Sequence, residues 1–208
     1  MKVTLKDGSV KEYSEPMSVN DIAFDIAGGL GRAACAGEVD GEVVDLRTTI
    51  DKDCTLNILT FKDEAGKAAY RHTASHVMAE AVKNLFPEAK LAIGPSIDTG
   101  FYYDFEHEPF SREDLDKIEV EMKKIIKKGA RLERFTLPTI KYMEDRNEPY
   151  KVELIKDLPE GSTISFYSQG EFVDLCAGPH LMNTKSIKAF KIISSSMAYW
   201  RGDSSKAR

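Results

Sequence analysis

Short stretches in which apolar and polar residues alternate occupy the first 62 residues of the chain. Residues 2–5 and 10–13 alternate in this way on either side of Asp7-Gly8, a dipeptide that favours the tight turn of a β-hairpin. Residues 39–44 repeat the arrangement around a second Asp-Gly pair, and residues 55–60 form one more alternating stretch. This pattern predicts a small mixed β-sheet.

A helical pattern interrupts these strands once. Ser18 is a favourable N-cap residue, and the apolar residues that follow it recur at helical spacing at Val19, Ile22, Ala23 and Ile26. Two glycines, Gly28 and Gly29, predict the end of this helix. We therefore expect residues 1–62 to form one small domain in which a single helix crosses the sheet.

Longer periodic stretches follow from residue 63 onward. One helix is predicted at residues 64–85, and a second at residues 111–128, where Ser111 and Asp114 resemble a capping box and Gly129 ends the helix. Strands are predicted at residues 93–95, 100–105, 163–167, 172–176 and 189–193. Because these strands cluster instead of alternating with helices, we expect an α+β fold with two domains, residues 1–62 and 63–208.

The composition narrows the class of protein. Of the 208 residues, 42% are hydrophobic and 30% are charged, which is enough apolar material for a core. No apolar run approaches the ~18 residues of a membrane span, and the N-terminus lacks the apolar stretch of a secretory signal. Three cysteines, an odd number, fit reduced thiols better than a disulfide framework. We therefore expect a cytoplasmic protein that has no membrane partner.

Charge is unevenly distributed within the net −5 of the chain. Residues 1–62 hold 11 acidic and 7 basic side chains, whereas residues 175–208 hold six basic side chains and one acidic one. A basic final stretch on an otherwise acidic protein suits a docked polyanion such as RNA. On charge alone, a solvated surface is the simpler interpretation.

Two of the four histidines, His72 and His76, are spaced i and i+4 in the predicted helix at 64–85. This spacing places both imidazoles on one helix face, where they can bind a metal or hold a water molecule between two nitrogens. Two unrelated histidines on a solvated face are the plain alternative. The pair is not the metalloprotease motif, because residue 73 is Thr and not the Glu that serves as base.

A second cluster of reactive side chains is Asp174-Leu175-Cys176-Ala177-Gly178-Pro179-His180. In a strand, Asp174 and Cys176 point to the same face, and the Gly-Pro turn brings His180 back beside them. Considered alone, Cys176 is most simply a buried structural thiol, and His180 a turn residue whose ring is hydrogen-bonded. Together with the histidine pair they form a set of nitrogen and sulfur donors that suits zinc, which favours a functional site.

Several motifs, in the same order, resemble the N-terminal part of bacterial threonyl-tRNA synthetase across essentially the whole chain. They are His72-x-x-x-His76, Ala92-Ile93-Gly94-Pro95, Gly100-Phe101-Tyr102-Tyr103-Asp104, Pro149-Tyr150-Lys151-Val152, Asp174 to His180, and Ala198-Tyr199-Trp200-Arg201-Gly202-Asp203-Ser204. The resemblance implies a TGS domain of β-grasp fold at residues 1–62 and a threonyl/alanyl editing domain at residues 63–208. In the family this domain continues past the last motif, so we expect a final strand to be missing here, together with the catalytic core and the anticodon-binding domain.

The resemblance also implies proofreading by hydrolysis of seryl-tRNA for threonine. A pocket that accepts threonine cannot strongly exclude an analogue that lacks one methyl group, so a second site removes the wrong amino acid. The implied catalytic residues are His72, His76, Lys151, Asp174, Cys176 and His180, and the implied substrate-binding residues are Tyr103, Gly94 and Pro95. The implied partners are the acceptor end of the mischarged tRNA and the rest of the synthetase.

The role of a metal and the substrate have open alternatives. Related alanyl-tRNA editing proteins bind zinc through these two motifs, whereas the threonyl site is thought to work without it. We expect a reaction that requires no cofactor, and His72, His76, Cys176 and His180 as the ligands if zinc binds. The competing interpretations are alanyl-tRNA editing, which the β-grasp start disfavours, and an RNA- or ligand-binding regulatory module with a structural zinc site.

Overall fold

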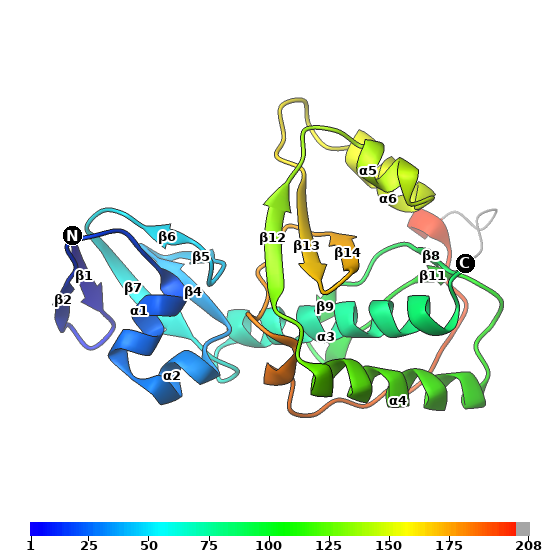
Figure 1. Cartoon of the computed structure of the whole chain (residues 1–208), viewed down its shortest axis with the longest axis horizontal. Helices are drawn as coiled ribbons and strands as arrows, with labels where there is room; N and C mark the ends of the chain where they lie inside the picture. The colour runs from blue at the N-terminus through cyan, green and yellow to red at the C-terminus, as the bar shows by residue number, and fades with distance from the viewer. Residues whose placement is uncertain (203–208) are drawn as a thin grey trace.

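The computed structural model describes residues 1–202 and begins with a five-stranded mixed sheet (Figure 1). Its order is β2-β1-β7-β4-β5, with bounds β1 Lys2–Leu5, β2 Val10–Glu12, β4 Ala36–Val39, β5 Glu42–Val44 and β7 Cys54–Leu59. Strands β1 and β7 are parallel, and the other neighbours are antiparallel. The short strands β3 (Met17–Ser18) and β6 (Thr49–Ile50) pair beside this sheet. The mixed sheet predicted from the alternating stretches is therefore present.

Helix α1 (Val19–Ile26) starts where the sequence predicts, because the Ser18 side chain accepts a hydrogen bond from the Asp21 backbone amide at 3.0 Å. The prediction that the glycines at 28 and 29 simply end this helix is wrong. Ala27 is extended and breaks the helix, and a second helix, α2 (Gly28–Ala33), then begins. Its Gly31 packs against α1 so closely that a Cβ atom would lie 2.4 Å from the Phe24 ring.

Two long helices form the base of the second part of the chain. Helices α3 (Glu64–Leu85) and α4 (Arg112–Lys128) lie side by side in Figure 1 and share one hydrophobic core. The predicted capping box at the start of α4 is present, with Asp114 N–H on Ser111 Oγ at 3.1 Å and Ser111 N–H on Asp114 Oδ2 at 2.9 Å. Gly129 ends α4 in the left-handed conformation, as the sequence predicts.

A three-stranded antiparallel sheet stands over α3 (Figure 1). Its order is β12-β13-β14, with bounds β12 Leu132–Thr136, β13 Ser165–Gln169 and β14 Phe172–Leu175. Helices α5 (Lys141–Asp145) and α6 (Pro149–Lys156) connect β12 to β13. The remaining elements are β8 Lys90–Leu91 paired with β11 Phe105–Glu106, β9 Ser96–Ile97 paired with β10 Gly100–Phe101, and the short 3₁₀ turns Thr184–Ser186 and Trp200–Gly202. The predicted α+β class is confirmed.

The strand predicted at residues 189–193 is not formed. This segment has no assigned secondary structure and pairs with no strand among the described residues. Ile192 packs into the α3–α4 core, and Lys191 forms an ion pair with Glu119 of α4 at 3.0 Å. The apolar residues of this segment are therefore explained by packing against helices and not by membership of a β-sheet.

The basic final stretch is partly neutralised where it is described. Besides Lys191, Arg201 pairs with Glu153 and Asp157 near α6. Lys206 and Arg208, together with Asp203-Ser204 of the last motif, lie outside the described residues. Within residues 1–202, no helix is both long and apolar enough to cross a lipid bilayer. The division of the chain at residue 62 stays a prediction, and α3 begins two residues after it.

Candidate functional site

Three imidazoles and one thiol meet between α3 and the loop that follows β14. His72 and His76 lie on one face of α3, with ring centroids 5.1 Å apart. The loop after β14, which contains a cis Gly178-Pro179 peptide, returns His180 to within 4.6 Å of the His72 ring and 4.4 Å of the His76 ring. Cys176 Sγ lies 3.1 Å from His180 Nε2 and 3.5 Å from His72 Nε2. The structure therefore brings both predicted clusters together.

These four side chains form a group that is able to hold a metal ion. One donor atom from each of His72, His76, Cys176 and His180 lies within 4.8 Å of all the others. Tetrahedral zinc with nitrogen and sulfur ligands places its donor atoms about 3.3–3.8 Å apart, so small side-chain adjustments would satisfy it. The donor chemistry, three imidazoles and one thiol, also fits zinc.

A fully buried carboxylate, Asp174 of β14, joins this group to α6. Its Oδ1 lies 2.9 Å from Lys151 Nζ, and its Oδ2 accepts a hydrogen bond from the Tyr103 hydroxyl at 2.5 Å. The same Oδ2 lies 3.6 Å from His76 Nε2. Burial alone would raise the pKa of Asp174, but Lys151 and then His76 lower it below its usual value. Asp174 is therefore ionised, and its oxygens are already occupied by protein groups.

Two of the predicted substrate-binding residues, Gly94 and Pro95, lie on the segment that supports the third, Tyr103. Gly94 packs directly under the Tyr103 ring, where a Cβ atom would lie 2.0 Å from Cδ2. The Gly94 carbonyl accepts a hydrogen bond from Ser75 Oγ of α3 at 2.8 Å. The Pro95 carbonyl accepts the Tyr102 amide at 3.4 Å, so its contact is to the turn that carries Tyr103.

Burial keeps the clustered histidines uncharged. Desolvation lowers the pKa of His72, lowers that of His76 to about 3 and lowers that of His180 well below its usual value. Desolvation also raises the pKa of Cys176 to about 12. At neutral pH the site thus presents neutral imidazoles and a protonated thiol beside the Lys151–Asp174 ion pair. His72 is the least buried of the three histidines.

Thr73, which the sequence reasoning did not single out, fixes the orientation of the His180 ring. Thr73 Oγ1 lies 2.8 Å from the Ala69 carbonyl, accepts the Leu181 amide at 3.0 Å and lies 3.0 Å from His180 Nδ1. If its one proton goes to the Ala69 carbonyl, the hydroxyl accepts Nδ1–H, a tautomer assigned from the hydrogen-bond network. His180 Nε2 then faces Cys176 Sγ with a free lone pair.

Comparison with known families and proteins gives a consistent result. A family model for the TGS domain matches residues 1–60, and one for the threonyl and alanyl tRNA synthetase second additional domain matches residues 164–208. The chain carries both of these domains. The second match contains the motif from Asp174 to His180 and excludes His72, His76 and Lys151.

Similarity to whole proteins agrees with the domain matches. Over 207 residues the chain is 65% identical to the threonine–tRNA ligase of Acetivibrio thermocellus and 58% identical to those of Clostridium botulinum strains Hall and Kyoto. Each alignment covers 98% of this chain and 33% of the relative, so the chain spans a third of the length of the curated relatives it matches. The resemblance to threonyl-tRNA synthetase noted from the motifs is confirmed, while the role of each site residue stays a prediction.

Proposed function

We propose that this chain hydrolyses the ester bond of seryl-tRNA for threonine and so removes serine attached in error. One observation carries the proposal: His72, His76, Cys176 and His180 form one cluster that touches the buried Lys151–Asp174 pair. The TGS and second additional domains and the similarity to threonine–tRNA ligases support it. The acceptor end of the tRNA, the remainder of a synthetase and a cytoplasmic location are parts of the same proposal.

An aminoacyl ester is already activated, so the site needs a positioned water molecule and stabilisation of the developing oxyanion. His72 is the group we assign to the water. It is neutral because burial lowers its pKa, and it is the most exposed of the three imidazoles, so it can accept the proton. The Lys151 ammonium is the nearby positive charge that can offset the oxyanion.

Asp174 acts as an orienting group in this proposal and does not bind the serine ammonium. Both of its oxygens already face protein partners, Lys151 on one side and Tyr103 with His76 on the other. Its side chain is also closed to solvent. A negative charge in this place holds the Lys151 ammonium and the His76 ring in fixed positions.

Cys176 does not attack the ester. Burial raises its pKa to about 12, so the thiolate that would be the nucleophile is scarce at neutral pH. The hydrogen bond from the Gly178 amide to Sγ at 3.2 Å stabilises the loop around it. Water is therefore the attacking group.

The proposed reaction requires no cofactor. If zinc occupies the site, His72, His76, Cys176 and His180 would hold it, and zinc that keeps one position open for water would supply Lewis-acid activation of that water. The donor set also favours a second candidate function, a binding module with a structural zinc site. Stoichiometric zinc whose removal unfolds the chain, together with no hydrolysis by the zinc-loaded chain, would support that function over the hydrolytic one.

The test is deacylation of seryl-tRNA for threonine by the purified chain and two variants. His72→Ala is expected to lower the rate by about 10²- to 10⁴-fold, the usual contribution of a general base. His107→Ala is the matched control, because His107 contacts Glu88 and Phe110 outside the cluster and should leave the rate unchanged. Equal rates for the wild type and His72→Ala would contradict the assignment.

A further inference from the structure

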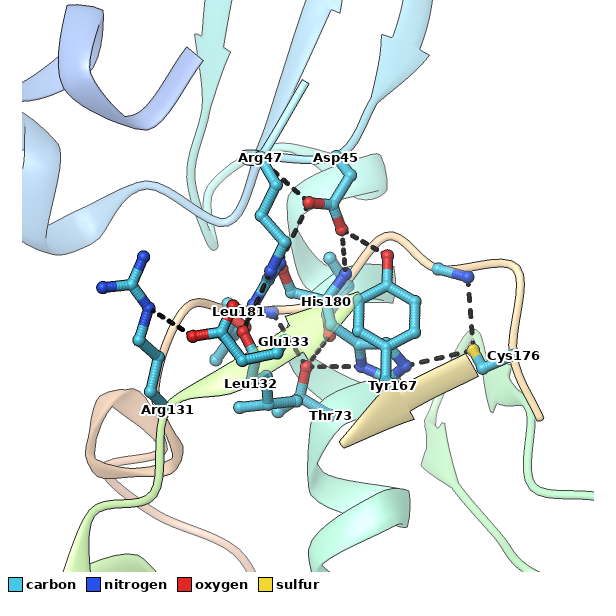
Figure 2. A network of polar contacts seen from close by, with 12 residues as sticks. Asp45, Arg47, Thr73, Arg131, Leu132, Glu133, Tyr167, Cys176, His180 and Leu181 are labelled. Atoms are coloured by element: carbon cyan, nitrogen blue, oxygen red, sulfur yellow. Dashed lines mark hydrogen bonds and ion pairs between the residues drawn. The ribbon is translucent and has the colours of Figure 1, made fainter. Parts of the chain in front are cut away.

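Two charged residues of the TGS domain reach across to the loop that carries His180 (Figure 2). Asp45 and Arg47 lie in the connection between β5 and β6. Asp45 Oδ2 accepts the backbone N–H of His180 at 3.1 Å and the hydroxyl of Tyr167 at 2.6 Å. A side chain of one domain thus holds the main chain of a site residue in the other.

Arg47 holds the same loop through its carbonyl groups. Its guanidinium donates to the carbonyl oxygens of His180 at 3.2 Å, Leu181 at 2.8 Å and Leu132 at 2.6 Å. It also pairs with Asp45 Oδ1 at 2.9 Å. Both side chains are largely buried, so water competes little for these bonds. The amide and the carbonyl of His180 are therefore both bound by the TGS domain.

These contacts bear directly on the geometry of the cluster. The His180 ring contacts Thr73 through Nδ1 and Cys176 through Nε2. Both contacts depend on where the main chain places the ring. Tyr167, which Asp45 holds by its hydroxyl, packs edge-on against the same ring at 4.4 Å. The Tyr167 hydroxyl oxygen also lies 2.2 Å from the position that a Cβ atom of Gly178 would occupy, so Tyr167 packs closely against the loop.

We propose that Asp45 and Arg47 are positioning residues that the TGS domain supplies to the hydrolytic site. They fix the loop at residues 176–181 and thereby the places of the Cys176 thiol and the His180 ring. Neither residue touches the ester. The consequence for catalysis rests on the proposed function, whereas the consequence for the loop does not.

The test compares Asp45→Ala with Asp25→Ala in the full chain. Asp25 is the matched control, because it also accepts a tyrosine hydroxyl (Tyr13, 2.8 Å) and pairs with a cation (Lys11, 3.0 Å) but stays within the TGS domain. Asp45→Ala is expected to lower kcat for seryl-tRNA by about 10- to 100-fold with KM little changed, the usual effect of removing an orienting partner. Asp25→Ala should leave both constants unchanged.

A second readout needs no catalysis. The rate at which iodoacetamide alkylates Cys176, followed by peptide mass mapping, is expected to rise in Asp45→Ala, because the buried thiol loses the loop that covers it. Cys54 in the TGS domain is the internal reference and should react at an unchanged rate. Asp45→Asn, which keeps one acceptor oxygen, should restore part of the protection if Asp45→Ala folds poorly.

The outcomes separate the two proposals. If the wild type hydrolyses nothing but Cys176 alkylation rises in Asp45→Ala, the positioning role stands and the proposed function fails. If Cys176 alkylation and kcat are both unchanged in Asp45→Ala, the positioning role is overturned. It is also overturned if Cys54 alkylation rises together with that of Cys176, or if Asp25→Ala loses as much activity, because general loosening then explains the effect.

Discussion

Replacing Lys151 with methionine would leave the buried carboxylate of Asp174 without the ammonium ion that lies 2.9 Å from it. Lys151 is 3% exposed and Asp174 is 0% exposed, so water cannot take the place of the lost charge. Removing one partner of such a pair costs about 3–5 kcal/mol of stability. Tyr103 still donates a hydrogen bond to Asp174, so we expect a loss of about 3 kcal/mol, at the lower end of that range.

Urea unfolding followed by tryptophan fluorescence measures this loss. The chain has one tryptophan, Trp200, which is buried and packs 4.8 Å from the ring of Tyr150, the neighbour of Lys151 in α6. A loss of about 3 kcal/mol lowers the urea midpoint by about 1–3 M for typical slopes. The deficit should shrink at acid pH, because Asp174 without its cation has a raised pKa and is neutralised by protonation.

The double variant Lys151→Met/Asp174→Asn separates the charge from the packing. It removes both charges and should recover most of the stability that Lys151→Met loses, because no unpaired charge remains buried. Asp174→Asn alone should be destabilised, since it leaves the Lys151 ammonium unpaired. Two results would refute the reasoning: a midpoint for Lys151→Met equal to that of the wild type, or a double variant no more stable than Lys151→Met.

The other predictions concern pH, metal and packing. Burial lowers the histidine pKa values, that of His76 to about 3. The free energy of unfolding is therefore highest above about pH 6.5 and falls by up to ~1.4 kcal/mol per pH unit for each such histidine as pH drops. Unfolding of the metal-free protein in urea at a series of pH values checks this, and a free energy of unfolding that does not change with pH would contradict it. Treatment with a chelator is expected to leave seryl-tRNA hydrolysis unchanged, with residual zinc measured by metal analysis; a loss that added zinc restores would show that the metal is required. Gly94→Ala forces the Tyr103 ring to move and should cost about 1–3 kcal/mol in the same urea assay, whereas Gly100→Ala, which has no atom within 4 Å of its added Cβ, should be nearly neutral.

The parts of the fold that were predictable from the sequence are those with local signals. The helix at 64–85 has the predicted bounds, and α4 begins after the predicted cap at Ser111 and ends before Gly129, because periodicity and caps lie within a few residues of each other. Strand β12 was not predicted, since only one of its five residues, Leu132, is fully buried and the apolar alternation is weak. The strand expected at residues 189–193 does not form, because a segment that packs against helices can show the same sequence pattern as a strand.

The candidate site was likewise predictable only where the sequence carries a local signal. The histidine spacing in α3 and the motif after β14 gave the members of the cluster, but not the residues that hold them. Asp45 is 135 positions from His180 and 122 from Tyr167, and Thr73 is 107 positions from His180. Contacts at such separations arise only when the tertiary structure forms, within a domain for Thr73 and between domains for Asp45. The sequence Asp45-Leu46-Arg47 near a turn carries no local sign of them.

The most direct test of the central claim is to compare, in one experiment, how fast the purified chain deacylates seryl-tRNA and threonyl-tRNA for threonine. We expect seryl-tRNA to be hydrolysed well above its spontaneous rate and threonyl-tRNA to be spared by at least about 10-fold, the discrimination that one methyl group allows. Both esters decaying at their spontaneous rates would contradict the account.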